Sequence, residues 1–284
     1  MTLPPTVGGA IAEVEARLAA AGVPSPRADA EWLARHVLRW SRAQLIAAAA
    51  ERLPAAAADV LAELADRRAQ REPLQLILGS VGFRHIEVLV RPGVFIPRPE
   101  TELLAGEAIA RLPAGGVVLE PCTGTGAVAC SVAQEASPSR VVATDISPVA
   151  VALARENTDR LSLDVEVLDG DLLEPVPADL RGAVDVLVCN PPYIAAGEVS
   201  ELATEVADWD PHDALVSGPT GQEVVSRLVA EASGWLRPGG WLLLEVADTR
   251  AAQTAALCES ADLADTAIIQ DLTGRDRIVA ARAR

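Results

Sequence analysis

Lysine is absent from this sequence, so its 24 basic side chains are all arginine. Aspartate and glutamate together number 40, which gives a formal net charge of −16 at pH 7. Proteins that bind nucleic acid through its phosphates need a basic surface. The charge therefore disfavours nucleic acid as a partner and is compatible with a small-molecule substrate or a protein partner.

Cysteine motifs and long apolar runs are also missing. The four cysteines are far apart, and no pair has the CxxC spacing of metal and redox sites, so we expect free thiols and no metal. The first residues lack the charged and apolar blocks of a signal peptide, and no apolar run is long enough to span a membrane. These absences predict a cytoplasmic protein without a membrane partner.

Aromatic residues make up 3% of the chain, whereas hydrophobic residues make up 50%. We therefore expect a substantial core that is mostly aliphatic. With 284 residues, the chain is long enough for one large domain or two ordinary ones.

Residues 1–72 are predicted to form a small helical domain. Apolar residues recur at helical spacing in short segments that proline, glycine or serine interrupts. The expected apolar faces consist of Ile11, Val14 and Leu18; Trp32, Leu33, Val37 and Leu38; Leu45 and Ile46; and Val60, Leu61 and Leu64. Recognition of a substrate by this bundle is a separate hypothesis.

The pattern changes in residues 73–97, which we interpret as a linker formed by a β-hairpin. Residues 74–79 and 83–90 have an extended pattern. Turn residues occupy 79–82 and 91–93.

The next stretch reads Ile-Pro-Arg-Pro-Glu-Thr-Glu over residues 96–102. Pro99 suits the first position of a helix, and acidic residues suit its first turn. Such a sequence is unusual for a linker, and it directly precedes an α/β region. We therefore expect this stretch to line the active site and Pro97 and Arg98 to contact the substrate.

Residues 98–284 are predicted to form a domain with a doubly wound, mostly parallel sheet, because strand and helix patterns alternate along them. The expected strands are 117–120, 141–145, 165–168, 184–189, 241–246, 267–269 and 277–280. The expected helices are 127–136, one that begins near Ser147, and 221–233.

A glycine-rich loop follows the first of these strands. A strand, a glycine loop and a helix in succession form the usual nucleotide-binding unit, in which glycine lets the backbone approach the ligand. The expected cofactor-binding residues of this loop are Glu120, Cys122, Thr123, Gly124, Thr125 and Gly126.

Acidic residues follow the next two strands. Asp145 lies about twenty residues beyond the loop, where a carboxylate can bind two ribose hydroxyls. Asp171, with Leu172 beside it, could accept a hydrogen bond from an adenine amine. The loop alone fits either NAD or S-adenosylmethionine, but the full GxGxxG spacing of dinucleotide sites is absent.

The strand over residues 184–189 ends at Asn190-Pro191-Pro192-Tyr193. Asn190 has a side-chain oxygen and Pro191 a backbone carbonyl, so two hydrogen-bond acceptors can converge on an –NH2 group. Tyr193 can lie against a planar group, and Pro192 stiffens the turn. We therefore predict that these four residues are catalytic and bind the substrate, that Asn190 also borders the cofactor, and that the cofactor is S-adenosylmethionine.

Nearly the whole chain resembles the PrmC/HemK family of class I methyltransferases. The shared motifs are Arg27 to Leu33 in the helical domain, Arg91 to Glu102, Asn190 to Tyr193, and Asp271 to Arg277. The resemblance implies methylation of the glutamine amide in the Gly-Gly-Gln motif of peptide chain release factors, with S-adenosylmethionine held by Cys122 to Gly126 and Asp145. The oligomeric state stays open, and a monomer is favoured.

Two segments depart from the family pattern. Cys122 stands where the family usually has a glycine, and Trp209-Asp210-Pro211 stands where it usually has an acidic Glu-Pro pair. One alternative is therefore a paralogue that methylates another planar nitrogen, on a protein, a small molecule or a nucleobase. Another is a non-catalytic binding module with the same fold.

Overall fold

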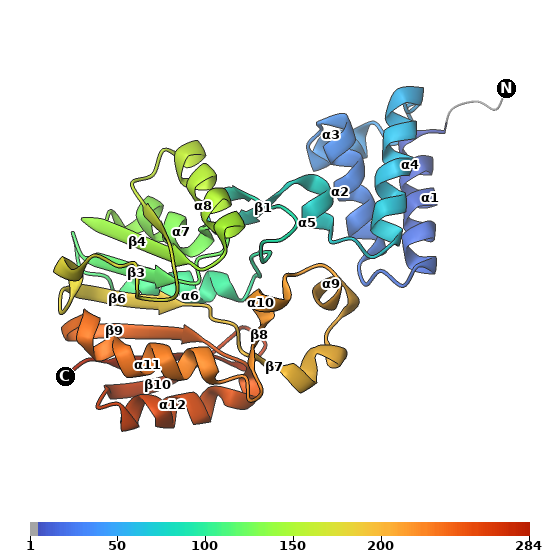
Figure 1. Ribbon diagram of the computed structural model, residues 1–284. Coiled ribbons are helices and arrows are strands. Elements are labelled where there is room, and N and C mark those ends of the chain that lie inside the picture. The colour runs from blue at the N-terminus through green and yellow to red at the C-terminus, as the bar shows by residue number, and fades with distance from the viewer. Residues whose placement is uncertain (1–4) are drawn as a thin grey trace. The chain divides into compact units, whose positions relative to one another are not determined.

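The computed structural model describes residues 5–284 and divides into two compact units, which meet in sequence between Gly79 and Ser80. Figure 1 shows the elements of both. The first unit consists of helices α1 Val7–Ala20, α2 Pro26–Leu38, α3 Arg42–Ala47, α4 Ala55–Ala69 and α5 Leu74–Leu78. The predicted helical bundle is therefore present.

The starts of these helices follow from local sequence. Ser41 begins α3 with a capping box, in which its side chain accepts from the Gln44 N–H and the Gln44 side chain binds back to Ser41. The Thr6 side chain caps α1 by accepting from the Gly9 N–H at 3.1 Å.

Three apolar residues assigned to the buried faces are exposed instead. Trp32 is 47%, Ile46 67% and Val60 45% exposed. In each case an adjacent leucine fills the interior: Leu33, Leu45 and Leu61 are each no more than 3% exposed. The buried stripe of each helix is narrower than the run of apolar residues suggested.

The segment from Leu74 to Leu78 was predicted to be extended, and this prediction is wrong. It forms α5, which begins after Pro73 and ends at Gly79 with a φ of 78°. Proline before the first turn and a left-handed glycine at the end are helix boundaries, and a five-residue segment with four apolar residues does not distinguish a helix from a strand.

The second unit starts with a hairpin of β1 Ser80–Phe83 and β2 Ile86–Leu89, with Phe83 paired to Ile86. A hairpin was expected here, but one strand was placed too early and its turn was put at residues 79–82. The turn is at Arg84, whose φ of 49° lies in the left-handed region that tight hairpin turns require.

The main sheet has seven strands in the order β10-β11-β9-β6-β3-β4-β5. Strands β5, β4, β3, β6 and β9 run parallel, whereas β11 is antiparallel to both β9 and β10. Their bounds are β3 Val117–Pro121, β4 Arg140–Asp145, β5 Glu166–Asp169, β6 Val184–Cys189, β9 Leu236–Glu245, β10 Ala264–Gln270 and β11 Asp276–Arg282.

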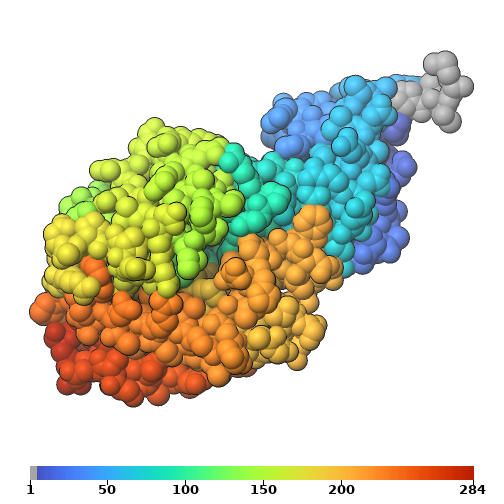
Figure 2. Space-filling model, in the orientation of Figure 1, coloured from blue at the N-terminus to red at the C-terminus, as the bar shows by residue number. Residues whose placement is uncertain are grey.

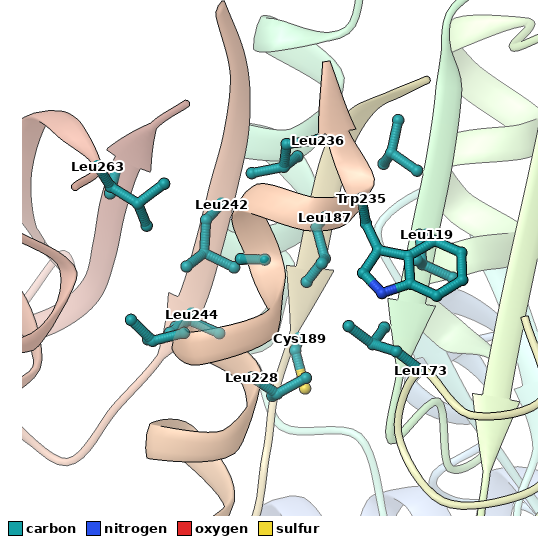
Figure 3. Close-up of a cluster of buried hydrophobic side chains, with 14 of the residues drawn as sticks. Leu119, Leu173, Leu187, Cys189, Leu228, Trp235, Leu236, Leu242, Leu244 and Leu263 are labelled. Carbon is teal, nitrogen blue, oxygen red and sulfur yellow. The ribbon is translucent and has the colours of Figure 1, made fainter. Parts of the chain in front are cut away.

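Helices cover both faces of this sheet (Figure 1). One apolar cluster joins the sheet to α11 Glu223–Trp235 and α12 Ala251–Ser260, and Figure 3 shows Trp235 beside Leu119 in this cluster. Another joins it to α6 Thr101–Arg111, α7 Ala127–Ala136 and α8 Pro148–Leu161. In Figure 2, the green-to-yellow first half of this unit and its orange-to-red second half form adjoining parts of the visible face. The predicted doubly wound α/β fold is confirmed.

Several elements were not predicted. They include α12 and, between β6 and α11, the segment of β7 Ile194–Ala195, η2 Ala196–Glu201, α9 Thr204–Ala207, α10 His212–Leu215 and β8 Val216–Gly218. The remaining short helices are η1 Ala178–Leu180 and η3 Asp248–Arg250. Within residues 5–284, no helix is both long and apolar enough to cross a membrane.

Candidate active site

Glu120, in β3, stabilises the glycine loop that follows this strand. Its side chain is buried, and its Oε2 accepts hydrogen bonds from the Thr123 hydroxyl and the Ala129 N–H, both at 2.8 Å. Burial raises the pKa of Glu120 to about 8, although these hydrogen bonds oppose the rise. These contacts give Glu120 a role in fixing the loop; its contact with a cofactor stays a prediction.

The loop itself turns through three residues with left-handed backbone: Cys122 at a φ of 59°, Gly124 at 56° and Gly126 at 80°. A β-carbon added to Gly126 would lie 3.3 Å from the Ala154 β-carbon on α8, so glycine is needed there for packing as well as for conformation. Cys122 adopts the conformation that suits the glycine of the related family.

Asp145 ends β4 and faces this loop. Its Oδ2 accepts from the Gly124 N–H at 2.8 Å, and its Oδ1 accepts from the Ser147 N–H at 2.9 Å. Burial raises the pKa of Asp145, and the neighbouring charge of Asp169 adds to the rise. Each oxygen keeps a lone pair, so the carboxylate can still accept from two ligand hydroxyls.

The other predicted cofactor residues lie around the same loop. Thr123 and Thr125 are buried, and the Thr125 carbonyl accepts from the Asn157 side chain at 2.9 Å. The Leu172 carbonyl accepts from the Thr144 hydroxyl at 2.6 Å. Asp171 forms an ion pair with Arg227 at 2.6 Å, so an adenine amine would have to share this carboxylate.

Two apolar residues beside Asp145 were missed by the sequence analysis. Ile146 is 66% exposed and Val149 is 54% exposed, which is unusual for large aliphatic side chains. They offer a surface against which a flat ring can lie. Their position in the sequence, directly after the acidic residue that ends β4, could have identified them.

Asn190 follows β6, whose last residue, Cys189, points into the apolar cluster (Figure 3). The half-buried Asn190 side chain donates from Nδ2 to the Thr101 hydroxyl oxygen at 3.3 Å. Thr101 is the first residue of α6 and belongs to the stretch predicted to line the active site. The structure thus brings together two motifs that are 89 residues apart.

Arg98, predicted to bind the substrate, forms an ion pair with Asp210, whose side chain is fully buried. Asp210 Oδ1 also accepts from the Ile96 N–H at 3.3 Å. The Arg98 guanidinium lies 5.1 Å above the Phe95 ring, and Pro97 is buried. Asp210 therefore connects the segment between β7 and β8 to the stretch before α6.

Glu245, at the end of β9, is a further residue that the sequence analysis missed. Leu244 pairs with Cys189 across β9 and β6, so Glu245 lies next to Asn190. Glu245 is 2% exposed, and burial raises its pKa to about 7, although the nearby Thr101 and Tyr193 side chains act to lower it. Glu245 ends an apolar strand, as Asp145 does, so the same sequence pattern could have identified it.

No histidine joins this group within the described residues. His85 and His212 have side chains that are 75% and 68% exposed. Among residues 5–284, no cluster of three or more histidine, cysteine, aspartate or glutamate side chains could hold a metal ion.

Comparison with known proteins first defines the class. A methyltransferase small domain profile matches residues 85–208, and a PrmC N-terminal domain profile matches residues 9–79. Solved structures with a similar fold include a Pyrococcus furiosus methyltransferase, with a TM-score of 0.53 and 20% identity over 69% of this chain and 87% of that one. Another is the Thermus thermophilus 16S rRNA N2 G1207 methyltransferase in complex with AdoMet and guanosine, with a TM-score of 0.53 and 21% identity over 72% of this chain and 50% of that one.

Curated relatives then define the family. A release factor glutamine methyltransferase of Mycolicibacterium smegmatis is 45% identical over 275 residues, which are 96% of each chain. One of Streptomyces coelicolor is 42% identical over 278 residues, again 96% of each chain. This chain belongs to the family of release factor glutamine methyltransferases, as the sequence motifs predicted.

Proposed function

We propose that this chain transfers a methyl group from S-adenosylmethionine to the side-chain amide nitrogen of a glutamine in a peptide chain release factor. The observation that carries this proposal is the 45% identity to a release factor glutamine methyltransferase over 96% of both chains. The Asn-Pro-Pro-Tyr turn at the end of β6 supports it, because the turn offers two acceptors to an –NH2 group.

The residues around the glycine loop fit S-adenosylmethionine. Gly124 leaves room for close approach, since nothing lies within 4 Å of an added β-carbon, and Asp145 keeps acceptor capacity for the ribose hydroxyls. Ile146 and Val149 offer apolar contact for the base. When bound, this cofactor supplies an electrophilic methyl group on a sulfonium centre.

At the acceptor side, the Asn190 side-chain oxygen and the Pro191 carbonyl accept hydrogen bonds from the glutamine –NH2. These bonds orient the amide nitrogen, whose lone pair is otherwise delocalised into the carbonyl. Orientation of two reactants is worth at most roughly 7–11 kcal/mol of the barrier. Pro192 and Tyr193 frame the planar amide.

The transfer needs no histidine base. A nitrogen–carbon bond forms as the sulfur–carbon bond breaks, and the alkylated nitrogen then releases a proton to water because alkylation makes it acidic. The exposure of His85 and His212 is consistent with this assignment.

Methyl transfer from labelled S-adenosylmethionine to purified release factor, mapped by mass spectrometry, tests the proposal. We expect one methylated glutamine in the Gly-Gly-Gln loop, and loss of transfer in Asn190→Ala with cofactor binding retained. Wild-type transfer rates in Asn190→Ala would contradict the mechanism.

A different acceptor is the second candidate, because Cys122 and Trp209-Asp210-Pro211 depart from the family pattern. Failure to label any release factor, together with labelling of another acceptor in the same lysate, would favour it. For the first candidate, we propose that residues 1–72 help to recognise the release factor and that the protein acts in the cytoplasm.

A further inference from the structure

The buried carboxylate of Glu245 has no role in the proposed chemistry, although it lies beside Asn190. The β6–β9 pairing of Cys189 with Leu244 sets this position, and the Ile278 pairing brings β11 to its other side. Glu245 is 2% exposed, and its Oε2 is a buried oxygen without a hydrogen-bond partner. A buried carboxylate is costly, so its retention next to a candidate catalytic residue calls for a reason.

Thr101 lies between Glu245 and Asn190. Its hydroxyl oxygen accepts from Asn190 Nδ2 at 3.3 Å, and the Thr101 side chain lies close enough to Glu245 to lower the pKa of that carboxyl group. A hydroxyl has one proton to donate, whereas an ionised carboxylate can only accept. If Glu245 takes the Thr101 proton, only the oxygen lone pairs of Thr101 remain for Asn190.

This order of donors and acceptors decides which end of the Asn190 amide faces outward. Asn190 must turn its –NH2 toward Thr101, and its Oδ1 is then directed away from Thr101. Only that orientation offers an acceptor to a substrate –NH2. The reversed amide would place one –NH2 against another.

We propose that Glu245 and Thr101 are positioning residues that set the orientation of the Asn190 side-chain amide, so that its oxygen faces the methyl acceptor. The inference rests on the proposed function, since it assigns Asn190 to the acceptor. It adds a hydrogen-bond chain in one direction, from Asn190 through Thr101 to Glu245.

The groups around Glu245 determine when it is ionised. Burial raises its pKa to about 7, and the nearby Glu100 adds to the rise, whereas Thr101, Arg277 and Tyr193 act to lower it. Arg277 is itself paired with Asp271 at 3.3 Å. Above about pH 7 the carboxylate accepts only, whereas below it the protonated acid can donate and the Thr101 proton can turn toward Asn190.

Thr101→Val and Thr101→Ser form the matched test, because valine removes the hydroxyl at constant shape and serine keeps it. In single-turnover methylation of release factor, we expect Thr101→Val to be about 10- to 100-fold slower, with cofactor affinity within about 2-fold of wild type. Thr101→Ser is expected to restore most of the rate. Thr249→Val, on the exposed η3, serves as the control.

Glu245→Gln supplies a second readout. Its amide can donate to Thr101, so we expect a rate at least about 10-fold lower and no step near pH 7, whereas the wild-type rate should rise as the pH passes through the pKa of Glu245. Wild-type rates and the same pH profile in Thr101→Val and Glu245→Gln would overturn the proposal. If Glu245→Gln does not fold, Thr101→Val and Thr101→Ser still test the proposal.

A measurement without any methyl acceptor separates this inference from the proposed function. The Asn190 side-chain amide resonances in a ¹⁵N–¹H spectrum can be identified by their absence in Asn190→Ala. We expect one of the two protons to be shifted by the Thr101 bond and to lose the shift in Thr101→Val but not in Thr101→Ser. No change in Thr101→Val would overturn the orientation, whereas failure of wild type to methylate release factor would count against the proposed function alone.

Discussion

Cys122 has a side chain at a position of the glycine loop whose backbone is left-handed. Its φ of 59° lies where a side chain costs roughly 1–2 kcal/mol relative to glycine. The half-buried thiol packs against the cluster around Leu119 and Cys189, which offsets part of that cost. This packing helps a side chain to be tolerated at a position that favours glycine.

Glu120→Gln is expected to change how stability depends on pH. The folded protein keeps the Glu120 proton up to about pH 8, whereas the unfolded chain loses it near the ordinary pKa of 4.5. Between these values the folded state binds more protons, so this group makes the protein less stable as the pH rises. Glutamine does not ionise, so Glu120→Gln should not lose stability in this way as the pH rises.

Urea unfolding at about pH 6 and about pH 8 measures this effect. The stability of Glu120→Gln relative to wild type should improve by on the order of 1 kcal/mol or more toward the higher pH, since one pKa unit corresponds to about 1.4 kcal/mol. Glu259→Gln, at an exposed position, should show no such trend. A difference between Glu120→Gln and wild type that does not vary with pH would contradict the assignment.

Gly126→Ala is expected to destabilise the protein more than Gly115→Ala. Both glycines have left-handed φ values, of 80° and 69°, so both substitutions strain the backbone. Only at Gly126 would the added carbon press on Ala154, at 3.3 Å, whereas nothing lies within 4 Å at Gly115. We expect a cost of about 1 kcal/mol at Gly115 and about 1–3 kcal/mol more at Gly126, measured by thermal unfolding. Equal costs at Gly115 and Gly126 would show that α8 moves to make room for the added carbon.

At the scale of elements, Asp210 joins the segment between β7 and β8 to the stretch before α6. Asp210→Ala leaves the Arg98 charge and the Ile96 N–H without this acceptor. We expect a loss of roughly 1.5–3 kcal/mol in stability and a raised KM for release factor. Cofactor affinity should stay unchanged, because Asp145 and the glycine loop are not involved.

Asp213→Ala is the matched control, since Asp213 has a fully exposed side chain three residues further on. Asp210→Glu restores the acidic residue of the family's Glu-Pro pair and should keep KM close to that of wild type. Calorimetry measures the affinity for the cofactor, and steady-state methylation measures the KM for release factor. A KM that rises equally in Asp213→Ala would argue against a specific role for the Asp210 contacts.

Local sequence signals explain which elements were predictable. Asn190 could be placed because a valine-rich strand stops at two prolines, and that signal needs no knowledge of distant residues. The α5 helix was mistaken for a strand because its five residues, four of them apolar, are too few to show a helical period. Glu245 was missed, and the contact of Thr101 with Asn190 was not predicted, because both depend on strand order and on where α6 begins, which contacts across the fold decide.

At the scale of the whole molecule, each unit has its own apolar core. Residues in the first unit, including Leu18 and Leu33, cluster separately from those of the sheet. We therefore expect a fragment of residues 80–284 to fold and to bind S-adenosylmethionine with an affinity within about 3-fold of the full chain. Its methylation of release factor should be at least about 10-fold weaker, if the helical unit contributes to recognition.

Calorimetry and the methyl-transfer assay, applied to the fragment and the full chain, check this expectation. Activity in the fragment equal to that of the full chain would remove recognition from the helical unit. A fragment that does not fold would contradict the independence of the two cores.

The strand order has a consequence for synthesis of the protein. Thr101, Asn190 and Glu245 come from α6, β6 and β9, and β9 lies in the sheet between β6 and the later strand β11. Contacts between residues so distant in sequence form slowly, and they need the intervening chain. On the ribosome, the group around Asn190 can assemble only after β9 has emerged, and Arg277 joins it later still, because β11 follows β9 in the chain. A chain released after β4 but before β9 would have the cofactor loop but an incomplete site for the methyl acceptor.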